Sequence, residues 1–566
     1  MTASANIARH LPLMAARQPD HPAVKIPRGR SAAGAIDYLI LSFAELESEV
    51  EAWGARLQRQ GVQGGDRVLV LVRQGLPLIA AAFALFKLGA VPVIIDPGMG
   101  RKSFLSCVTR SKPRVLLGIP RAQVMSHVFR AAFKTVEVRV WVSGSPTART
   151  VKSGGPVSRR AAADREVGPP FEPVASAATD LAAILFTSGS TGAPKGVCYE
   201  HGMFEAQVQL VRDTYGITPG EVDLPMLPIF ALFNPALGMT TIVPELDPSR
   251  PAAVDPAKIV QAIIQEKVTN SFGSPTLWRK IFDHCLAHDI SLPSLRRVLC
   301  AGAAVPASLW ADSARVLPNG KLHSPYGATE VLPVATVSSD EMESRPELGS
   351  LIGRPLAANQ IKIIALTDGP IASLADAREL LPGETGEIIV TGPTVTKEYD
   401  QLPNATARAK ISDSQPSTLN SQPGDSVAVW HRLGDAGRID AAGRLWFCGR
   451  IAERVETAGG ILHTEPCEQV FRRHAQVARC ALIGLGPRGR QEPALVVQPA
   501  AAATDRLALA RELRQLSVQH AHTAGIRKFF FHESFPVDVR HNAKIHRLAL
   551  AQWAATATSL EPENSA

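Results

Sequence analysis

The chain has 566 residues, of which 45% are hydrophobic and 20% are charged. This length and balance are typical of a globular protein with several domains and large buried cores. The 60 Lys and Arg residues against 52 Asp and Glu residues give a net charge of +8, which suits anionic ligands. No stripe of basic residues is interleaved with aromatic ones, so nucleic acid is not an expected partner.

Seven cysteines are scattered along the chain and never form a C-x-x-C pair. This pattern argues against a disulfide framework and against a zinc site, and it favours a reducing cytoplasm. The longest apolar run, residues 76–86, ends at Lys87 and is far shorter than the ~20 residues that span a bilayer. We therefore expect no transmembrane segment, and the run predicts a buried helix that stops at Gly89.

Predicted helices and strands alternate over the first 175 or so residues. The expected elements are helices over residues 43–60 and 76–86, and strands over residues 67–72, 91–95 and 114–117. Such alternation predicts an α/β fold with layered, mainly parallel sheets. Two polar stretches, residues 143–173 and 400–427, predict exposed excursions from these layers.

A loop rich in hydroxyl groups and glycine follows the apolar strand predicted over residues 181–186. Its residues are Thr187, Ser188, Gly189, Ser190, Thr191 and Gly192, with Lys195 shortly after them. The glycines let the backbone approach a ligand closely, and the hydroxyl and N–H groups can surround a phosphate chain. Gly196 follows the lysine, whereas a P-loop NTPase has Ser or Thr there to hold magnesium, so this is not a Walker A loop.

This stretch resembles the phosphate-binding signature of the adenylate-forming superfamily, which comprises acyl-CoA synthetases, luciferases and peptide-synthetase adenylation domains. The resemblance implies an α/β fold with a large N-terminal adenylation domain over residues 1–448, made of layered α/β subdomains and a small β subdomain. It also implies a hinge over residues 449–454 and a small mobile α+β lid domain over residues 455–566. ATP and Mg²⁺ are the implied cofactors.

Further signatures of the superfamily occur downstream in the expected order. Tyr326, Gly327, Ala328, Thr329 and Glu330 are consecutive. An aromatic ring can stack on adenine, a glycine allows close backbone approach, and the oxygens of Thr and Glu suit Mg²⁺. By resemblance the nucleotide-binding set also includes Gly302, Ala303, Asp435 on the ribose hydroxyls and Arg450 on the ribose or phosphates, and the metal ligands are Thr187 and Glu330.

The catalytic residues implied by the resemblance are Lys544, Lys195 and Arg450. Lys544 lies in a C-terminal loop that aligns with the one carrying the superfamily's catalytic lysine, although Ala543 replaces the usual glycine before it. Its implied role is electrostatic, because an ammonium between the attacking carboxylate and the α-phosphate stabilises the charge that develops there.

An apolar segment after the phosphate loop predicts an acyl pocket formed by Phe230, Ala231 and Phe233 together with Gly302. Ala231 stands where many acyl-CoA synthetases have a histidine, and Ala452 stands where the hinge usually has Asp or Lys. With these departures the chain looks most similar to the olefin β-lactone synthetases of bacterial long-chain hydrocarbon biosynthesis. There, a 2-alkyl-3-hydroxy fatty acid is adenylated and its own hydroxyl attacks the mixed anhydride, without CoA.

Three alternatives remain open at this point. The first is a long-chain fatty acyl-CoA or acyl-AMP ligase, which a dependence on CoA would reveal. The second is a non-catalytic nucleotide- or lipid-binding module, which the presence of Lys195, Glu330, Asp435 and Lys544 disfavours. The third is a domain that loads a carrier protein, but no carrier sequence follows residue 566. By resemblance, complexes with the pathway's β-lactone decarboxylase and reductase are expected.

Overall fold

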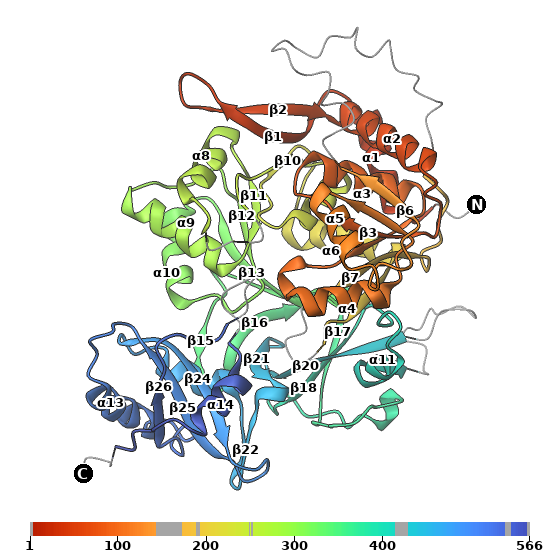
Figure 1. Cartoon of the computed structure of the whole chain (residues 1–566). Coiled ribbons are helices and arrows are strands. Elements are labelled where there is room, and N and C mark those ends of the chain that lie inside the picture. Colours follow the sequence, from red (N-terminus) through yellow and green to blue (C-terminus); the bar gives the residue numbers. More distant parts are fainter. Residues whose placement is uncertain are drawn as a thin grey trace.

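The computed structural model describes residues 4–142, 173–187, 193–247, 250, 253–413, 428–537 and 545–562. In Figure 1 the red to green segments occupy the upper part, and the chain after Arg450, in blue, lies below them at the left, beside the teal segments that precede it. The polar stretch predicted over residues 143–173 falls almost wholly outside the described residues. Within the described parts, every helix is too short or too polar to cross a lipid bilayer.

A six-stranded sheet in the N-terminal part carries the start of the phosphate loop. Its strands, in spatial order, are β6 (Val138–Trp141), β5 (Val115–Gly118), β3 (Arg67–Leu71), β4 (Val91–Ile94), β7 (Leu181–Phe186) and β8 (Gly196–Glu200). All neighbours are parallel except β7 and β8. Along β3, Val68 and Val70 belong to one core and Leu69 to another. Because successive strand residues point to opposite faces, the sheet is buried on both sides, as its apolar sequence predicts.

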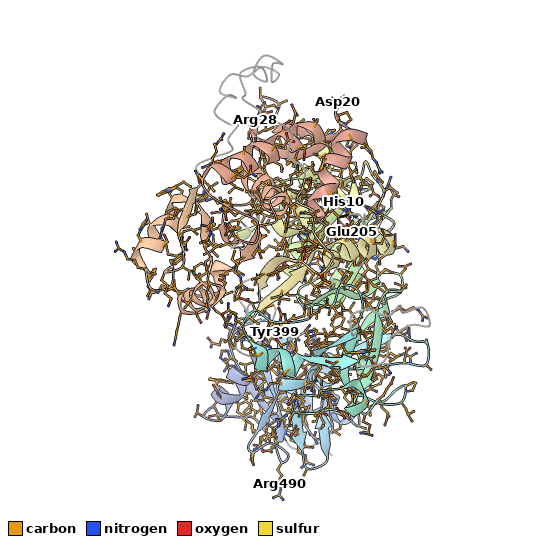
Figure 2. All side chains as sticks on the ribbon, turned by 90° about the vertical axis from the view of Figure 1, so that its right-hand side faces the viewer. His10, Asp20, Arg28, Glu205, Tyr399 and Arg490 are labelled. Atoms are coloured by element: carbon orange, nitrogen blue, oxygen red, sulfur yellow. The ribbon has the colours of Figure 1, made fainter. Side chains whose placement is uncertain are left out.

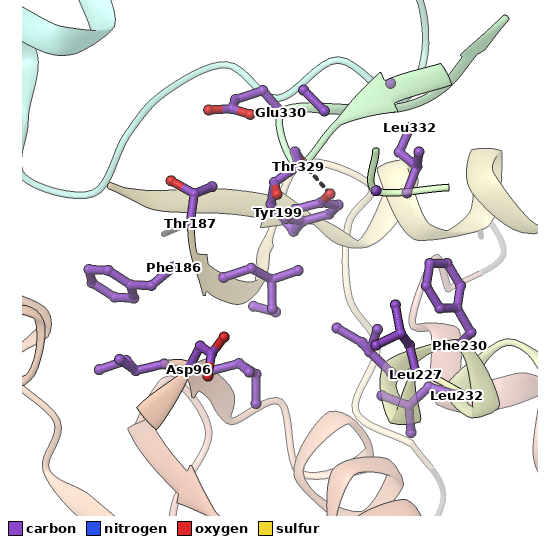
Figure 3. Close-up of a pocket in the computed structure, with 18 of the residues that line it drawn as sticks. Asp96, Phe186, Thr187, Tyr199, Leu227, Phe230, Leu232, Thr329, Glu330 and Leu332 are labelled. Carbon is purple, nitrogen blue, oxygen red and sulfur yellow. Dashed lines mark hydrogen bonds between the residues drawn. The ribbon is translucent and has the colours of Figure 1, made fainter. Parts of the chain in front are cut away.

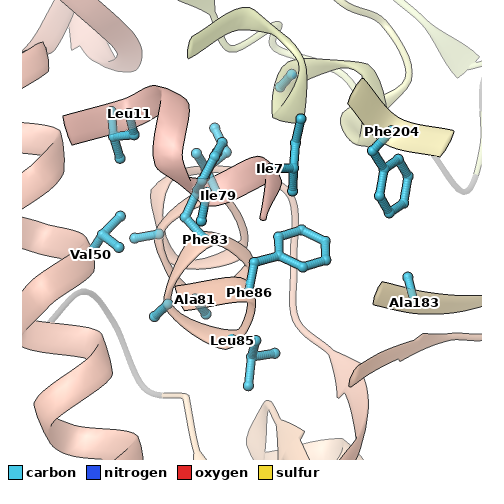
Figure 4. Packing of buried hydrophobic residues seen from close by; sticks show 14 of the residues in the cluster. Ile7, Leu11, Val50, Ile79, Ala81, Phe83, Leu85, Phe86, Ala183 and Phe204 are labelled. Atoms are coloured by element: carbon cyan, nitrogen blue, oxygen red, sulfur yellow. The ribbon is translucent and has the colours of Figure 1, made fainter. Parts of the chain in front are cut away.

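Helices cover both faces of this sheet, and α3, α4 and α5 connect its strands. They are α1 (His10–Arg17), α2 (Phe43–Arg59), α3 (Leu76–Lys87), α4 (Arg101–Ser111), α5 (Pro120–Val128) and α6 (His201–Tyr215). The helix predicted over residues 76–86 is confirmed as α3, whose apolar side chains pack in the core shown in Figure 4. Gly89, with a φ of 68°, follows its end, in the left-handed region that favours glycine.

A second, much larger sheet spans the rest of the N-terminal part. Its strands, in spatial order, are β17 (Gln360–Ile364), β18 (Gly386–Thr391), β20 (Ala428–Ile439), β21 (Leu445–Arg450), β16 (Gly349–Pro355), β14 (Val331–Ser338), β13 (Lys321–Ala328), β12 (Arg297–Cys300), β11 (Asn270–Gly273), β9 (Val222–Asp223), β10 (Thr240–Ile242), β1 (Pro22–Arg30) and β2 (Ile36–Ser42), with β15 (Ser344–Arg345) beside β16 and β19 (Lys410–Asp413) beside β20. The run from β13 to β1 is parallel, and the strands outside it pair antiparallel. The helices beside it are α7 (Asn234–Leu237), α8 (Pro256–Glu266), α9 (Pro275–Ala287), α10 (Ala307–Val316) and α11 (Pro403–Ala409).

One hairpin of this sheet was not predicted from the sequence, and one polar stretch beside the sheet was predicted to be exposed but is partly buried. The hairpin β1–β2 precedes the first predicted helix and joins the second sheet through β10, not the sheet that follows it in the chain. The stretch from residue 400, predicted to be exposed, begins with the buried carboxylate of Asp400, which pairs with Arg67 at 2.9 Å. It continues through α11 and β19, and residues 414–427 lie outside the described residues. Its polar composition misled the prediction because the polar groups are paired within the fold.

The C-terminal part is a small α+β unit. Its elements are the ribbon β22 (Val455–Thr457) and β23 (Gly460–Leu462), the sheet β24 (Val477–Leu485), β25 (Glu492–Pro499) and β26 (Lys528–Phe531), and the helices α12 (Thr464–Phe471), α13 (Arg506–Val518) and α14 (Arg547–Ala554). Helix α12 lies against the N-terminal part, where Ser350 donates a hydrogen bond to Glu465 at 2.9 Å. Between the two parts, β21 ends at Arg450 and a single turn of 3-10 helix covers Ile451–Glu453.

Candidate functional site

A cavity of about 2430 Å³ opens between the two sheets of the N-terminal part and reaches the C-terminal part. Its lining includes Thr187, Lys195, Thr329 and Glu330 at one end and an apolar set of side chains at the other. Pockets for single small ligands occupy roughly 300–1,000 Å³, so this cavity has room for more than one ligand.

The phosphate loop begins and ends at the wall of this cavity. The N–H of Thr187, directly after β7, donates to the carbonyl oxygen of Lys195 at 3.0 Å, which closes the base of the loop. Lys195 holds its ammonium 4.6 Å from the ring centre of Tyr399. The predicted binding residues Ser188, Gly189, Ser190, Thr191 and Gly192 lie outside the described residues.

Three predicted nucleotide-binding residues meet beside the cavity. Asp435 and Arg450 are cross-strand partners on β20 and β21, and Nη1 of Arg450 lies 2.8 Å from Oδ1 of Asp435. The hydroxyl of Tyr326, near the end of β13, donates to Oδ2 of Asp435 at 2.5 Å. Burial and the carboxylate of Asp435 raise the pKa of Tyr326, and Asp435 also raises the pKa of Arg450. The tyrosine therefore remains protonated and the arginine remains charged beside a buried carboxylate.

The turn after Tyr326 places Thr329 and Glu330 on the cavity wall. Gly327 is needed by this turn itself, because an added Cβ would come within 2.7 Å of the carbonyl oxygen of Val331. Tyr199 on β8 donates its hydroxyl hydrogen to the carbonyl oxygen of Thr329. These contacts fix the backbone from which the side chains of Thr329 and Glu330 project.

Several groups around Glu330 were not predicted from the sequence. The hydroxyl of Tyr399 donates to Oε1 of Glu330 at 2.7 Å, and Figure 2 shows Tyr399 at mid-height of the molecule, above the C-terminal part. Thr396 donates from its N–H to the carbonyl oxygen of Glu330 at 2.9 Å. Lys410 donates to the carbonyl oxygen of Thr396, and burial lowers the pKa of Lys410 to about 7. Lys195, Glu330 and Lys410 thus form a cluster of charged groups beside the loop.

Apolar side chains line much of the cavity, from Phe186 directly before the phosphate loop to the side opposite it. Leu227, Phe230 and Leu232 lie together on one side in Figure 3, Phe186 and Asp96 lie on the other, and Tyr199 and Thr329 lie between the two groups. Phe230 stacks on Phe272 with ring centres 3.9 Å apart. The wall in this part of the cavity is therefore mostly aromatic and aliphatic, with a few polar side chains such as Gln207 and Asp223 among them.

Three of the four predicted pocket residues line the large cavity, and the fourth does not. Phe230, Phe233 and Gly302 line the large cavity. Ala231 is only 4% exposed and lies outside that lining, beside a separate void of about 10 Å³. The reason is the 3-10 helix η4 (Pro228–Leu232), whose turn directs neighbouring residues to different sides. Ala303, expected at the adenine, also lies outside the lining, whereas Gly302 before it is part of it.

The loop that carries Lys544 lies outside the described residues, but its flanks are placed. Val537 and Ile545 form an antiparallel bridge, and His546 is one of the residues that line the cavity. Lys544 is thus two residues from a cavity-lining position.

Among the residues that the structure describes, no three His, Cys, Asp or Glu side chains gather into a metal-binding group. Glu330 and Thr187 nevertheless present oxygen atoms at the cavity wall (Figure 3). Mg²⁺ is commonly held by one or two protein carboxylates together with waters and substrate phosphates, so these two residues fit a magnesium ion that arrives with a nucleotide.

Comparison with known proteins gives concordant results. The family described as AMP-binding enzyme matches residues 13–400. The olefin beta-lactone synthetase of Xanthomonas campestris pv. campestris is 42% identical over 98% of both chains. That of Stenotrophomonas maltophilia is 43% identical over 98% of this chain and 99% of its own. Among solved structures, an amide bond synthetase from Marinactinospora thermotolerans superposes with a TM-score of 0.74 at 22% identity, covering 97% of this chain and 99% of its own, which is a likeness of fold.

Proposed function

Because the chain belongs to the AMP-binding enzyme family, we propose that it activates a 2-alkyl-3-hydroxy fatty acid with MgATP and closes the acyl-AMP to a β-lactone. The observation that carries this proposal is the 42–43% identity, over nearly the whole chain, to two olefin beta-lactone synthetases. Adenylation of the carboxylate releases pyrophosphate. The 3-hydroxyl oxygen then forms a bond to the carbonyl carbon, the bond from that carbon to the phosphate oxygen breaks, and AMP leaves.

The polar end of the cavity supports the adenylation step. A carboxylate such as that of Asp435 can accept hydrogen bonds from both ribose hydroxyls, and Arg450 beside it carries a positive charge toward the phosphates. Thr187 and Glu330 would hold Mg²⁺, which neutralises phosphate charge when it is bound. Lys195 and Lys544 would stabilise the charge that develops around the α-phosphate.

The apolar end supports a substrate with two alkyl chains. Its walls belong to two different hydrophobic clusters: Phe83, Phe86, Phe230 and Phe233 pack in one, and Met99, Phe104, Met125 and Phe186 pack in the other. A substrate branched at C2 could extend one chain along each wall, with its carboxylate between them near Thr329. This placement keeps hydroxyl and carbonyl close together and away from water, and intramolecular reactions gain greatly from such proximity.

The proposal extends to the domain arrangement and the cellular context. Residues 449–454 would be the hinge between an adenylation domain and a lid. Ala452 replaces the usual Asp or Lys of that hinge, which fits a lid that keeps one orientation and does not rotate between half-reactions. The seven cysteines are all unpaired and buried, which supports a reducing, cytoplasmic compartment. Complexes with a reductase that supplies the hydroxy acid and a decarboxylase that consumes the lactone are part of the same proposal.

The test is incubation of the protein with MgATP and a synthetic 2-alkyl-3-hydroxy fatty acid in the absence of CoA. We expect AMP release with matching growth of oxetanone ring signals in the proton NMR spectrum. Lys544→Ala should lower the rate by roughly 10²–10³-fold, as expected for loss of a group that stabilises transition-state charge. Lys258→Ala, at an exposed position of α8, is the matched control and should retain full activity. AMP release only after CoA is added, with a thioester as product, would instead identify an acyl-CoA ligase.

A further inference from the structure

Helix α6 presents one polar side chain to the acyl end of the cavity. Phe204, Gln207 and Val211 all line the cavity, and their spacing of three and four residues places them on one face of the helix. Gln207 is only 4% exposed. A buried amide in an apolar wall is expected to have both its polar atoms in hydrogen bonds.

The amide of Gln207 has a determined orientation. Its Nε2 lies 3.0 Å from the carbonyl oxygen of Leu332, which can only accept a hydrogen bond, so the nitrogen must face Leu332. Oε1 therefore points elsewhere, and it is buried without a hydrogen-bond partner. An unsatisfied buried acceptor is unfavourable unless a ligand supplies the donor.

The position of this acceptor relates it to the reacting carboxylate. Tyr199 donates a hydrogen bond to the carbonyl oxygen of Thr329, and Gln207 donates one to that of Leu332. Both side chains therefore stabilise the short turn that joins β13 to β14. Figure 3 shows Tyr199, Thr329 and Leu332 on the same side of the cavity, facing the group that contains Phe230. Gln207 thus belongs to the cavity lining, holds the turn that carries Thr329 through its Nε2, and leaves Oε1 as a buried acceptor without a partner.

We propose that Gln207 is a positioning residue whose Oε1 accepts a hydrogen bond from the 3-hydroxyl of the substrate. This inference rests on the proposed function and deepens it, because it explains how a hydroxylated acid is selected over a plain one. An amide oxygen is a hydrogen-bond acceptor and not a base at neutral pH, so Gln207 fixes the direction of the O–H bond. With the O–H bond directed at Oε1, a lone pair of the hydroxyl oxygen faces the activated carbonyl carbon. As the new C–O bond forms and the bond to the phosphate oxygen breaks, the amide oxygen does not keep the proton, which passes to the departing AMP.

The experiment compares two acids and two variants. The acids are a 2-alkyl-3-hydroxy fatty acid and the same acid without the 3-hydroxyl, both measured by ATP–pyrophosphate exchange. Gln207→Leu removes the acceptor, and Gln209→Leu makes the same change at an exposed position of the same helix. We expect Gln207→Leu to lower kcat/KM for the hydroxy acid about tenfold, the range expected for one hydrogen bond, and to change the value for the deoxy acid less than twofold. Gln209→Leu should change neither.

A second measurement uses only the wild-type protein, in case Gln207→Leu fails to fold. With a nonhydrolysable ATP analogue present, the hydroxy acid should raise the Tm more than the deoxy acid at equal concentration. Equal stabilisation by both acids would overturn the proposal, and so would an equal fall of both kcat/KM values in Gln207→Leu, which indicates a purely structural role. If the wild type discriminates between the acids but forms no oxetanone, the lactone function fails while the role of Gln207 stands.

Discussion

Two aspartates near the cavity, Asp223 in its lining and Asp435 beside it, are equally buried but have different partners. Asp435 and Asp223 are each 3% exposed. Asp435 lies beside the guanidinium of Arg450 and accepts from the hydroxyl of Tyr326. Among the described residues, Asp223 pairs with no Lys or Arg; it accepts from the amides of Asn234 at 2.9 Å and Asn270 at 2.6 Å. The first carboxylate lies beside a cation, and the second is held only by neutral donors.

The difference between the two carboxylates distinguishes the region proposed for the nucleotide from the region proposed for the alkyl chains. Burial raises the pKa of Asp223 to about 6, because neutral amides offset only part of the cost of removing a charge from water. The cations Lys195 and Arg450 line the cavity at the end where phosphates are expected. Around Asp223 the lining instead has the amides of Asn234 and Asn270 and the ring of Phe230, which suits uncharged alkyl chains and a hydroxyl group.

The largest effect is expected from Asp435→Ala. Loss of the carboxylate removes the acceptor proposed for the ribose hydroxyls and leaves Arg450 without its partner. Hydrogen bonds to charged groups contribute roughly 1.5–3 kcal/mol, so the KM for ATP should rise about 10- to 150-fold. Steady-state kinetics of pyrophosphate exchange with varied ATP provides the measurement.

Asp283→Ala is the matched control for that change, since Asp283 is exposed on α9 and, within the part of the chain that the structure describes, forms its ion pair with Arg279 on its own helix. It should leave the KM for ATP unchanged. The assignment of Asp435 to the nucleotide would be wrong if Asp435→Ala altered the KM for the fatty acid while that for ATP stayed constant.

A smaller effect, on the fatty acid and not on ATP, is expected from Phe230→Leu at the apolar end. The change removes the stack on Phe272 and opens the wall of the acyl pocket. We expect kcat/KM for the fatty acid to fall roughly tenfold, near the lower limit for a single altered apolar contact, while the KM for ATP changes less than twofold. Phe531→Leu, at a partly buried position of β26 in the C-terminal part, controls for the loss of a ring. Equal changes in both KM values would show that the two ends are not separate.

The residues proposed for the polar end could be selected from the sequence because they occur as short contiguous motifs, and their roles stay a prediction. Tyr326 to Glu330 are the end of β13 and the turn that follows it, and Asp435 with Arg450 become neighbours through a simple hairpin of β20 and β21. The alternation of helix and strand likewise predicted the buried helix α3 and the parallel strands of the first sheet. Local patterns suffice where the contacts are local in the chain.

The rest depends on contacts between distant segments, which one sequence does not reveal. Tyr399 reaches Glu330 from 69 residues away, and the hairpin β1–β2 joins a strand formed by residues 240–242. Ala231 and Phe230 are adjacent in sequence, yet only the second lines the large cavity. Gln207 could have been noticed as a polar residue among the apolar positions of α6, but the free Oε1 follows only from its contact with Leu332.

The smallest effect concerns Asp223 itself and appears in stability. Because the folded state holds the pKa near 6, above the ordinary value of 3.8, the folded protein binds more protons than the unfolded chain between these pH values. The stability contributed by Asp223 is therefore full below about pH 4 and is lost as pH rises through 6. Asp223→Asn removes this titration while keeping the size of the side chain, and Asn270 has an unpartnered Oδ1 that can accept from the new amide.

We accordingly expect Asp223→Asn to be more stable than the wild type above pH 7, on the order of 1 kcal/mol, since one pKa unit corresponds to about 1.4 kcal/mol. Denaturant unfolding at several pH values measures the difference, which should shrink toward pH 4. Asp283→Asn, at the exposed position on α9, should show no such trend. If the difference in the free energy of unfolding between Asp223→Asn and the wild type stayed constant with pH, the pKa of Asp223 would be the same in the folded and unfolded states. The contrast between the two buried aspartates would then lie in packing alone.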